Sequence, residues 1–129
     1  MTTFIKITHD GPRNAAVQII GYGARVWFPV VRLVDLIPKP HKVKVDAVYY
    51  AVSDKMEVQL AWVTEENRTP FLPISGRGKI DFSEVSGLVS PDGDRLFEIE
   101  MRVLSESLKE PSDQLFAVVL DLSKHIGEE

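Results

Sequence analysis

Two neighbouring segments of this 129-residue chain, 43–52 and 56–63, follow a two-residue alternation of side-chain character. Side chains of an extended strand point to opposite faces in turn, so such a period collects one apolar set on one face. A short polar connection at 53–55 joins the two segments. We therefore predict two strands that pair as a β-hairpin.

Similar segments recur along the chain and are separated by turn residues. The expected strands are 4–8, 15–20, 24–36 with a break at Pro29, 79–82, 97–103 and 115–122. The chain contains 16 Val and 9 Ile but only 7 Ala, a bias typical of pleated sheets. The spacing predicts an all-β, antiparallel β-sandwich of about eight strands, either jelly-roll-like or Ig-like. We expect a single domain over 1–129, with a short polar C-terminal tail at 123–129 that frays.

Individual segments carry further expectations. Segment 115–122 is apolar on both faces, as in a central strand. Glu98 and Glu100 occupy the polar face of segment 97–103, which we expect to face solvent. Segment 64–69 reads as a polar loop, and 70–73 as a surface crossing anchored by apolar residues. Segment 83–90 is expected to hold one helical turn.

Composition excludes several classes of function. Lys and Arg total 15 against 19 Asp and Glu, a net charge of −4 that weighs against a nucleic-acid partner. The absence of cysteine excludes disulfides, thiolate nucleophiles and cysteine-ligated metal sites. No apolar run approaches the roughly 20 residues of a membrane span, and the N-terminus has no signal-peptide core. We therefore expect that the protein does not associate with membranes and that it is assembled in the cytoplasm.

Motifs for chemistry are weak. His9, His41 and His125 lie far apart in sequence and are expected to be exposed polar residues rather than metal ligands. Asp92-Gly93-Asp94 lacks the remaining oxygen ligands of a calcium loop, and Gly76-Arg77-Gly78-Lys79 lacks the spacing and helix of a phosphate loop. No serine lies in a Gly-x-Ser-x-Gly elbow. We predict no catalytic residues, no metal, no cofactor and no enzymatic activity.

Segments in a fixed order resemble a known family. They are His9-Asp10-Gly11-Pro12-Arg13-Asn14-Ala15-Ala16-Val17-Gln18-Ile19, Val43-Lys44-Val45-Asp46, Val48-Tyr49-Tyr50, Val58-Gln59-Leu60-Ala61-Trp62, Gly78-Lys79-Ile80-Asp81-Phe82 and Val118-Val119-Leu120-Asp121-Leu122-Ser123-Lys124. In this order, over nearly the whole chain, they are similar to small virion structural proteins of tailed bacteriophages. The resemblance implies a non-enzymatic structural part of the virion.

Among the structural parts of a virion, we expect a decoration or cement protein on the capsid exterior that stabilises the particle. The expected partners are the phage major capsid protein or other virion proteins, with homo-oligomers on the particle. A neck, tail-tube or tail-tip component is the first alternative, and a carbohydrate-binding β-sandwich the second. Contact regions are predicted in 24–40 and 64–74, where proline and aromatic residues gather. The candidate contact residues are Trp27, Phe28, Pro29, Pro38, Pro40, Pro70, Phe71, Leu72 and Pro73.

Overall fold

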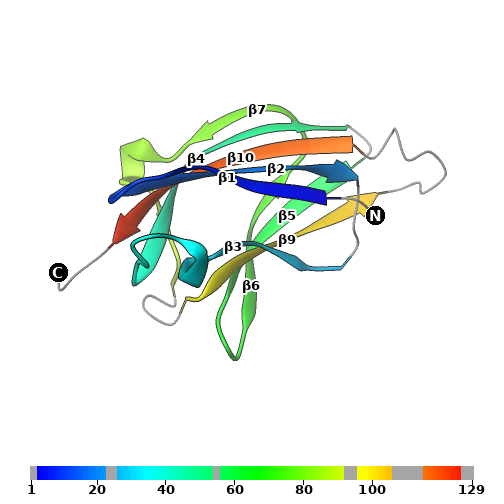
Figure 1. The fold of residues 1–129 in the computed structure, drawn as a ribbon. Coiled ribbons are helices and arrows are strands. Elements are labelled where there is room, and N and C mark those ends of the chain that lie inside the picture. The colour runs from blue at the N-terminus through cyan, green and yellow to red at the C-terminus, as the bar shows by residue number, and fades with distance from the viewer. Residues whose placement is uncertain (1–2, 23–25, 54–55, 92–95, 106–114, 126–129) are drawn as a thin grey trace.

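The computed structural model describes residues 3–22, 26–53, 56–91, 96–105 and 115–125, which form ten strands and two 3₁₀ turns in two stacked sheets (Figure 1). The strands are β1 (Thr3–Asp10), β2 (Asn14–Tyr22), β3 (Phe28–Arg32), β4 (Lys42–Val52), β5 (Met56–Val63), β6 (Arg68–Ile74), β7 (Gly76–Asp81), β8 (Leu88–Val89), β9 (Glu98–Ser105) and β10 (Leu115–His125). The turns are η1 (Leu33–Asp35) and η2 (Ser83–Val85), the latter within the segment predicted to hold a helical turn. No helix in this described part is long and apolar enough to cross a membrane.

The two sheets are antiparallel and together form a jelly roll. Sheet A has the strand order β1-β2-β10-β4-β7, with the short β8 also paired to β4, and sheet B has the order β3-β9-β5-β6. The chain passes from one sheet to the other at six of the nine connections between successive strands, the arrangement produced by two Greek keys. The predicted antiparallel β-sandwich is confirmed, and of the two predicted variants this strand order is the jelly roll rather than the Ig-like one.

Apolar side chains from both inner faces fill the space between the sheets. Sheet A contributes Phe116, Val118 and Leu120 from β10, each at most 1% exposed. Sheet B contributes Trp62, which stacks on Phe71 with ring centroids 4.0 Å apart. β10 lies between β2 and β4, so the prediction of a central strand at 115–122 is confirmed.

The predicted hairpin between 43–52 and 56–63 is wrong. Both segments are strands, but β4 belongs to sheet A and β5 to sheet B. β4 pairs with β10 and β7, whereas β5 pairs with β9 and β6. Each of the two strands buries an apolar face, and placing them in opposite sheets lets these faces meet in the core. A period of two predicts a strand, but it does not specify the partner of that strand.

Prolines mark the edges of sheet B. Segment 68–74, predicted as part of a loop and a surface crossing, is strand β6 at one edge of the sheet. Pro70 and Pro73 are tolerated there because an edge strand leaves one row of backbone groups unpaired. Pro29 lies in the opposite edge strand, β3, where the register shifts between Pro29 and Val31 as the predicted break requires.

The C-terminal part of β10 is anchored rather than frayed. Strand pairing continues to His125, and the Lys124 side chain is fully buried. Its ammonium group forms an ion pair with Asp10 and donates a hydrogen bond to the Ile37 carbonyl at 3.0 Å. The predicted tail therefore begins three residues too early, because Lys124 continues the inward-facing positions of β10. Residues 126–129, Asp92-Gly93-Asp94 and residues 106–114 lie outside the described residues.

Candidate protein-binding site at one end of the sandwich

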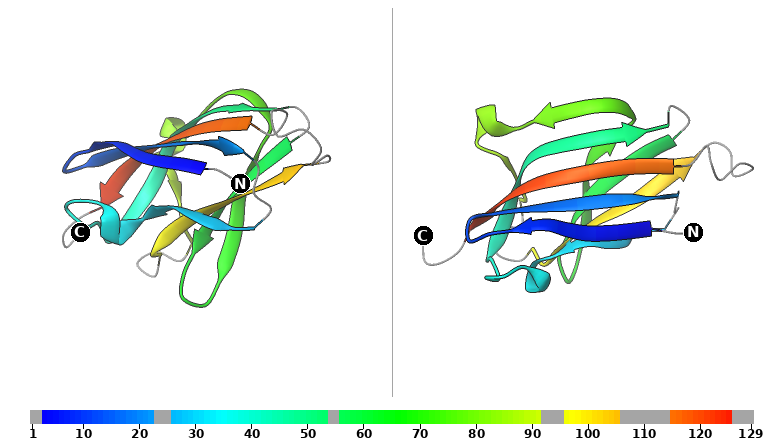
Figure 2. Two further views of the ribbon diagram at one scale, coloured as in Figure 1. Left: turned by 45° about the vertical axis from the view of Figure 1, so that its right-hand side comes forward. Right: turned by 45° about the horizontal axis from the view of Figure 1, so that its top comes forward.

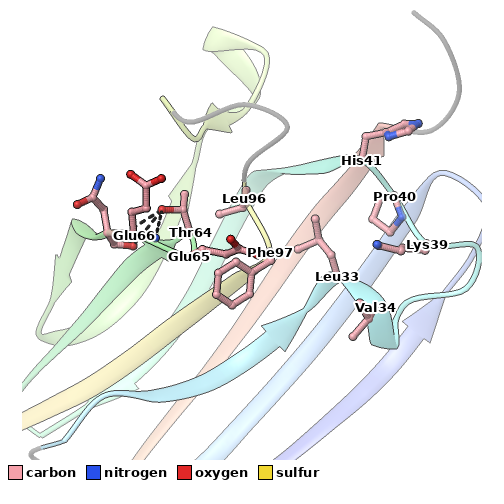
Figure 3. Close-up of a pocket in the computed structure, with 11 residues that line it drawn as sticks. Leu33, Val34, Lys39, Pro40, His41, Thr64, Glu65, Glu66, Leu96 and Phe97 are labelled. Carbon is pink, nitrogen blue, oxygen red and sulfur yellow. Dashed lines mark hydrogen bonds between the residues drawn. The ribbon is translucent and has the colours of Figure 1, made fainter.

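The two regions predicted to make contacts meet at one end of the sandwich. Residues from 24–40 and 64–74, together with the start of β9, surround a cavity of about 740 Å³, here called the end hollow (Figure 3). Its lining residues are Leu33, Val34, Lys39, Pro40, His41, Thr64, Glu65, Glu66, Asn67, Leu96 and Phe97. Segments that are distant in sequence therefore form one concave surface.

Backbone hydrogen bonds hold the walls of the end hollow together. The Leu33 amide donates to the Phe97 carbonyl, and the Phe97 amide donates to the Val63 carbonyl, each at 3.1 Å. These bonds join η1, the start of β9 and the end of β5. Leu33 and Leu96 are buried beneath the surface, whereas Val34 is 64% exposed. The site thus has a rigid apolar base and an apolar side chain open to a partner.

A tight turn between β5 and β6 forms the acidic wall. The Thr64 hydroxyl accepts hydrogen bonds from the amides of Asn67 at 3.0 Å and Glu66 at 3.3 Å. The Thr64 amide donates to the Asn67 carbonyl at 2.9 Å, which closes the turn. Exposed Glu65 and Glu66 lie on this side of the hollow, so it carries negative charge.

The opposite wall carries basic and imidazole groups. Lys39 and His41 are exposed there. The His41 amide donates to the His125 carbonyl at 2.9 Å, so two of the histidines expected to lie apart are neighbours. Within the described ranges, no group of three or more His, Asp or Glu residues is placed to hold a metal ion.

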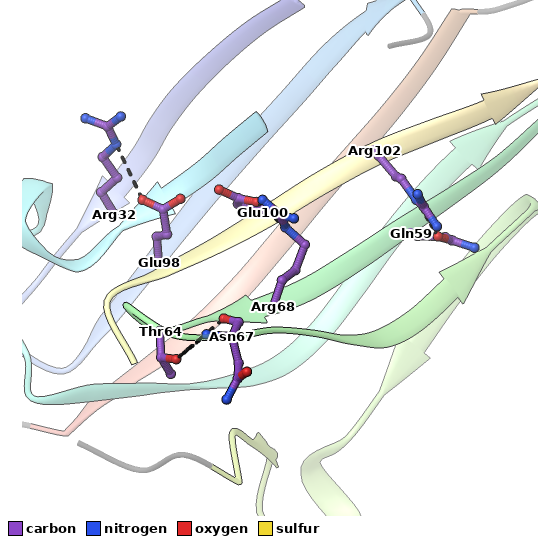
Figure 4. A network of polar contacts seen from close by, with 8 residues as sticks. All are labelled: Arg32, Gln59, Thr64, Asn67, Arg68, Glu98, Glu100 and Arg102. Atoms are coloured by element: carbon purple, nitrogen blue, oxygen red, sulfur yellow. Dashed lines mark hydrogen bonds and ion pairs between the residues drawn. The ribbon is translucent and has the colours of Figure 1, made fainter. Parts of the chain in front are cut away.

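A carboxylate pair lies on the outer face of sheet B, beside the end hollow (Figure 4). Glu98 and Glu100 follow Phe97 on β9, and each residue is only 8% exposed, which contradicts the prediction that they face solvent. Neighbouring side chains cover them: the Arg68 Nε lies 2.7 Å from Glu100, and the Arg32 Nε lies 3.8 Å from Glu98. The strand alternation placed them on the outer face correctly but gave no sign of this cover.

The two carboxyl groups respond differently to this environment. Burial, reinforced by the hydrogen bond and charge of Glu100, raises the pKa of Glu98 to about 7. Although burial opposes ionisation of Glu100 as well, hydrogen bonds from Glu98 and Arg68 outweigh it and lower the pKa of Glu100. Glu98 is therefore only partly ionised near neutral pH, and the pair carries less negative charge than two fully ionised carboxylates would.

Trp27 packs beside this pair, between two arginines. The Arg68 and Arg102 Cζ atoms lie 5.3 Å and 4.7 Å from the centre of the Trp27 ring. Arg102 is in turn fixed by Gln59, whose Oε1 accepts from the Arg102 Nε at 2.8 Å. Two guanidinium groups thus already contact the ring of Trp27, a predicted contact residue. Trp27 is therefore part of the polar cover of sheet B.

The predicted contact residues have varied surroundings. Pro38, Pro70 and Pro73 are exposed, whereas Trp27, Phe28 and Pro29 are half-buried. Pro40 is buried, and half-buried Phe71 and Leu72 pack against the core, as expected of the apolar anchors of 70–73. A residue type typical of interfaces is equally typical of an edge strand that closes a core.

Sequence reasoning missed Phe97, which it placed on the inner face with Ile99. Phe97 precedes β9 and is 38% exposed at the end hollow. The alternation extends back from β9 to Phe97 and gives no sign that the strand begins one residue later, at Glu98.

No protein-family model and no curated protein matches this chain. Several solved structures are similar at low scores. KdgF from Halomonas sp. is 17% identical with a TM-score of 0.37, covering 95% of this chain and 81% of that one. A cupin domain from Bordetella pertussis Tohama I is 12% identical with a TM-score of 0.37, covering 95% and 92%. The Tobacco streak virus coat protein is 12% identical with a TM-score of 0.37, covering 98% and 88%. None of these similarities bears on what this chain binds.

Proposed function

We propose that this protein is a non-enzymatic virion structural protein of a tailed bacteriophage, bound to the capsid exterior as a decoration protein. The ordered sequence segments supply the phage assignment. The observation that carries the binding role is the end hollow, where two predicted contact regions converge. There Val34 is 64% exposed above a base of buried leucines.

In this proposal, the end hollow receives an apolar side chain of the capsid subunit. Glu65 and Glu66 on one wall, and Lys39 on the other, orient the partner through charges of opposite sign. Burying apolar groups at a rigid site favours binding, because little side-chain order has to be created. Many weakly held copies around one particle then add up to a stabilised shell.

The test uses purified capsids that lack this protein, to which the recombinant protein is added before sedimentation. The wild-type protein is expected to sediment with capsids in a saturable manner. Val34→Asp is expected to weaken binding at least about tenfold, since roughly 1.4 kcal/mol corresponds to a factor of ten. Val85→Asp is the matched control, because Val85 on η2 is 69% exposed and does not line the hollow.

Copy number separates the capsid from the alternatives. Hundreds of copies per particle support a decoration protein, whereas about six or twelve copies support a ring in the neck or tail. Absence from purified particles, or Val34→Asp and wild-type proteins binding equally well, contradicts the proposal. Binding to a glycan array without binding to particles favours the carbohydrate-binding alternative.

A further inference from the structure

The outer face of sheet A is an open surface far from the end hollow's polar walls. In Figure 2 (right), β7, β4, β10, β2 and β1 lie side by side and no described element crosses in front of them. This face exposes Phe4 at 68%, Leu115 at 51%, Tyr49 at 39% and Ile20 at 36%. Exposed apolar side chains gathered on one sheet face indicate an interaction surface.

Strand register places large and small residues of this face on one line. Phe4 pairs with Ile20, Ile20 with Ala117, and Ala117 with Ala51. β1 and β2 therefore carry the bulky members of the line, while β10 and β4 carry the small ones. We call this line the Phe4–Ala51 row.

A depression lies where the row is small. It has a volume of about 810 Å³ and is lined by Ile20, Ala51, Val52, Ser53, Arg77, Leu115, Phe116 and Ala117. The paired Ala117 and Ala51 lie in it, and Phe4 projects from the same row on the other side of β2. The face therefore carries both a protruding apolar side chain and a recess that contains two alanines, with Arg77 among its other lining residues.

The next line along the strands carries polar and aromatic side chains. Lys6 pairs with Gln18, Gln18 with Val119, and Val119 with Tyr49. The Tyr49 ring already attracts a cation, because the Lys79 Nζ lies 5.1 Å from its centre.

We infer that this face is the interface between two copies of the chain. A two-fold axis parallel to the strands, midway between β2 and β10, places β1 of each copy over β4 of the other. Phe4 then lies over Ala51 of the second copy, and Ile20 lies over its Ala117. In the next line, Lys6 lies over Tyr49 of the second copy. Two sheets can stack face to face in this way with their strands nearly aligned.

A second copy fits this face better than an unrelated partner does, because the protruding side chain and the recess that can receive it are on the same face. A two-fold interface requires that the same patch supply the protrusion and the recess. Phe4 and the two alanines meet this requirement in one row. The inference is independent of the proposed function, since it needs neither the capsid nor the end hollow.

Sedimentation equilibrium of the purified protein tests the interface. The wild-type protein is expected to dimerise, and Phe4→Ala is expected to weaken the dimer about a hundredfold or more, because two Phe4 side chains are lost from it. Ala51→Phe alone is expected to weaken it as well, since two large side chains then collide. The double variant Phe4→Ala with Ala51→Phe restores the large-over-small pairing, and we expect it to dimerise within about tenfold of wild type. Val85→Asp is the control and is expected to dimerise like the wild type.

Cross-linking tests the arrangement directly, since the chain contains no cysteine. Within one copy, β2 and β10 separate Phe4 from Ala51, a distance of about 14 Å for three strand spacings. A thiol cross-linker shorter than this is expected to join Phe4→Cys,Ala51→Cys chains into dimers, but not Phe4→Cys,Val85→Cys chains. A protein that is monomeric throughout the micromolar range overturns the inference. A dimer that is insensitive to Phe4→Ala overturns it equally, and neither result affects the capsid-binding assay.

Discussion

Because the ammonium group of Lys124 is buried, we predict that replacing the two members of its ion pair has unequal effects on stability. The Lys124 side chain is fully buried, whereas that of Asp10 is 21% exposed. Removing the carboxylate with Asp10→Ala leaves a buried positive charge whose remaining acceptor is the Ile37 carbonyl. Removing one partner of a buried pair costs about 3–5 kcal/mol, and we take about 3 kcal/mol because Asp10 is partly solvated.

Removing the charge itself should cost far less. Lys124→Met keeps the length of the side chain, and Asp10 keeps the Ile37 amide as a donor at 2.8 Å as well as its contact with solvent. We expect a cost of about 1 kcal/mol, since apolar replacements of buried ion pairs are often close to neutral. The double variant should resemble Lys124→Met, because without the ammonium group the loss of Asp10 matters little.

Thermal unfolding followed by circular dichroism measures this difference. For 129 residues, about 1 kcal/mol corresponds to about 4 °C, so Tm should fall by about 12 °C for Asp10→Ala and about 4 °C for Lys124→Met. Burial raises the pKa of Asp10, but hydrogen bonds from Lys124 and the Ile37 amide outweigh it and lower that pKa below 3.8. The contribution of Asp10 is therefore present above pH 3.8 and is lost as the pH falls through the folded-state pKa. Equal losses for the two variants at neutral pH would refute this reasoning.

Three further predictions concern single positions. Because the folded-state pKa of Glu98 is about 7 against an ordinary 4.5, wild-type stability should decline as the pH rises from 4.5 to above 7, and Glu98→Gln should flatten this part of the profile of Tm against pH. Phe71→Ala should lower the free energy of unfolding by about 3 kcal/mol in urea titrations, because Phe71 stacks on Trp62 in the core. Pro73 is exposed, so Pro73→Ala should change this free energy by no more than about 0.5 kcal/mol. A larger loss for Pro73→Ala than for Phe71→Ala would make Phe71 a surface residue. Gly87→Ala should lower Tm more than Gly76→Ala. Both glycines have positive φ, but only at Gly87 would an added Cβ approach neighbouring atoms to 3.0 Å. Equal losses of Tm would show that backbone strain, and not the close contact, determines the loss of stability.

The positions of the strands were easier to predict than the strands with which they pair. Alternation located β4, β5 and β9 because each buries one face, and the doubly apolar segment 115–122 identified the centre of sheet A. The hairpin between β4 and β5 failed because pairing is decided by the whole set of faces that must be buried together.

The site was predictable in part for a similar reason. Proline and aromatic content pointed to 24–40 and 64–74, which do meet at the end hollow. It did not distinguish Pro38, which is exposed, from Pro40, which is buried, because both fit a stiff loop. Glu98 lies close to Arg32 on β3 and to Arg68 on β6. Both arginines are distant from β9 in sequence, so no local pattern near β9 predicts that they cover it.

The position of β10 has a consequence for how the chain acquires its structure. Its register joins Val118 to Ile19 on one side and to Tyr50 on the other, so the middle of sheet A depends on residues that leave the ribosome long after β2 and β4. Until β10 inserts, two strands expose unpaired backbone and apolar side chains, which invites association with other incomplete chains. Such distant pairings are slow to form, so the emergence of β10 from the ribosome, rather than local strand formation, sets the earliest moment at which this sandwich can close.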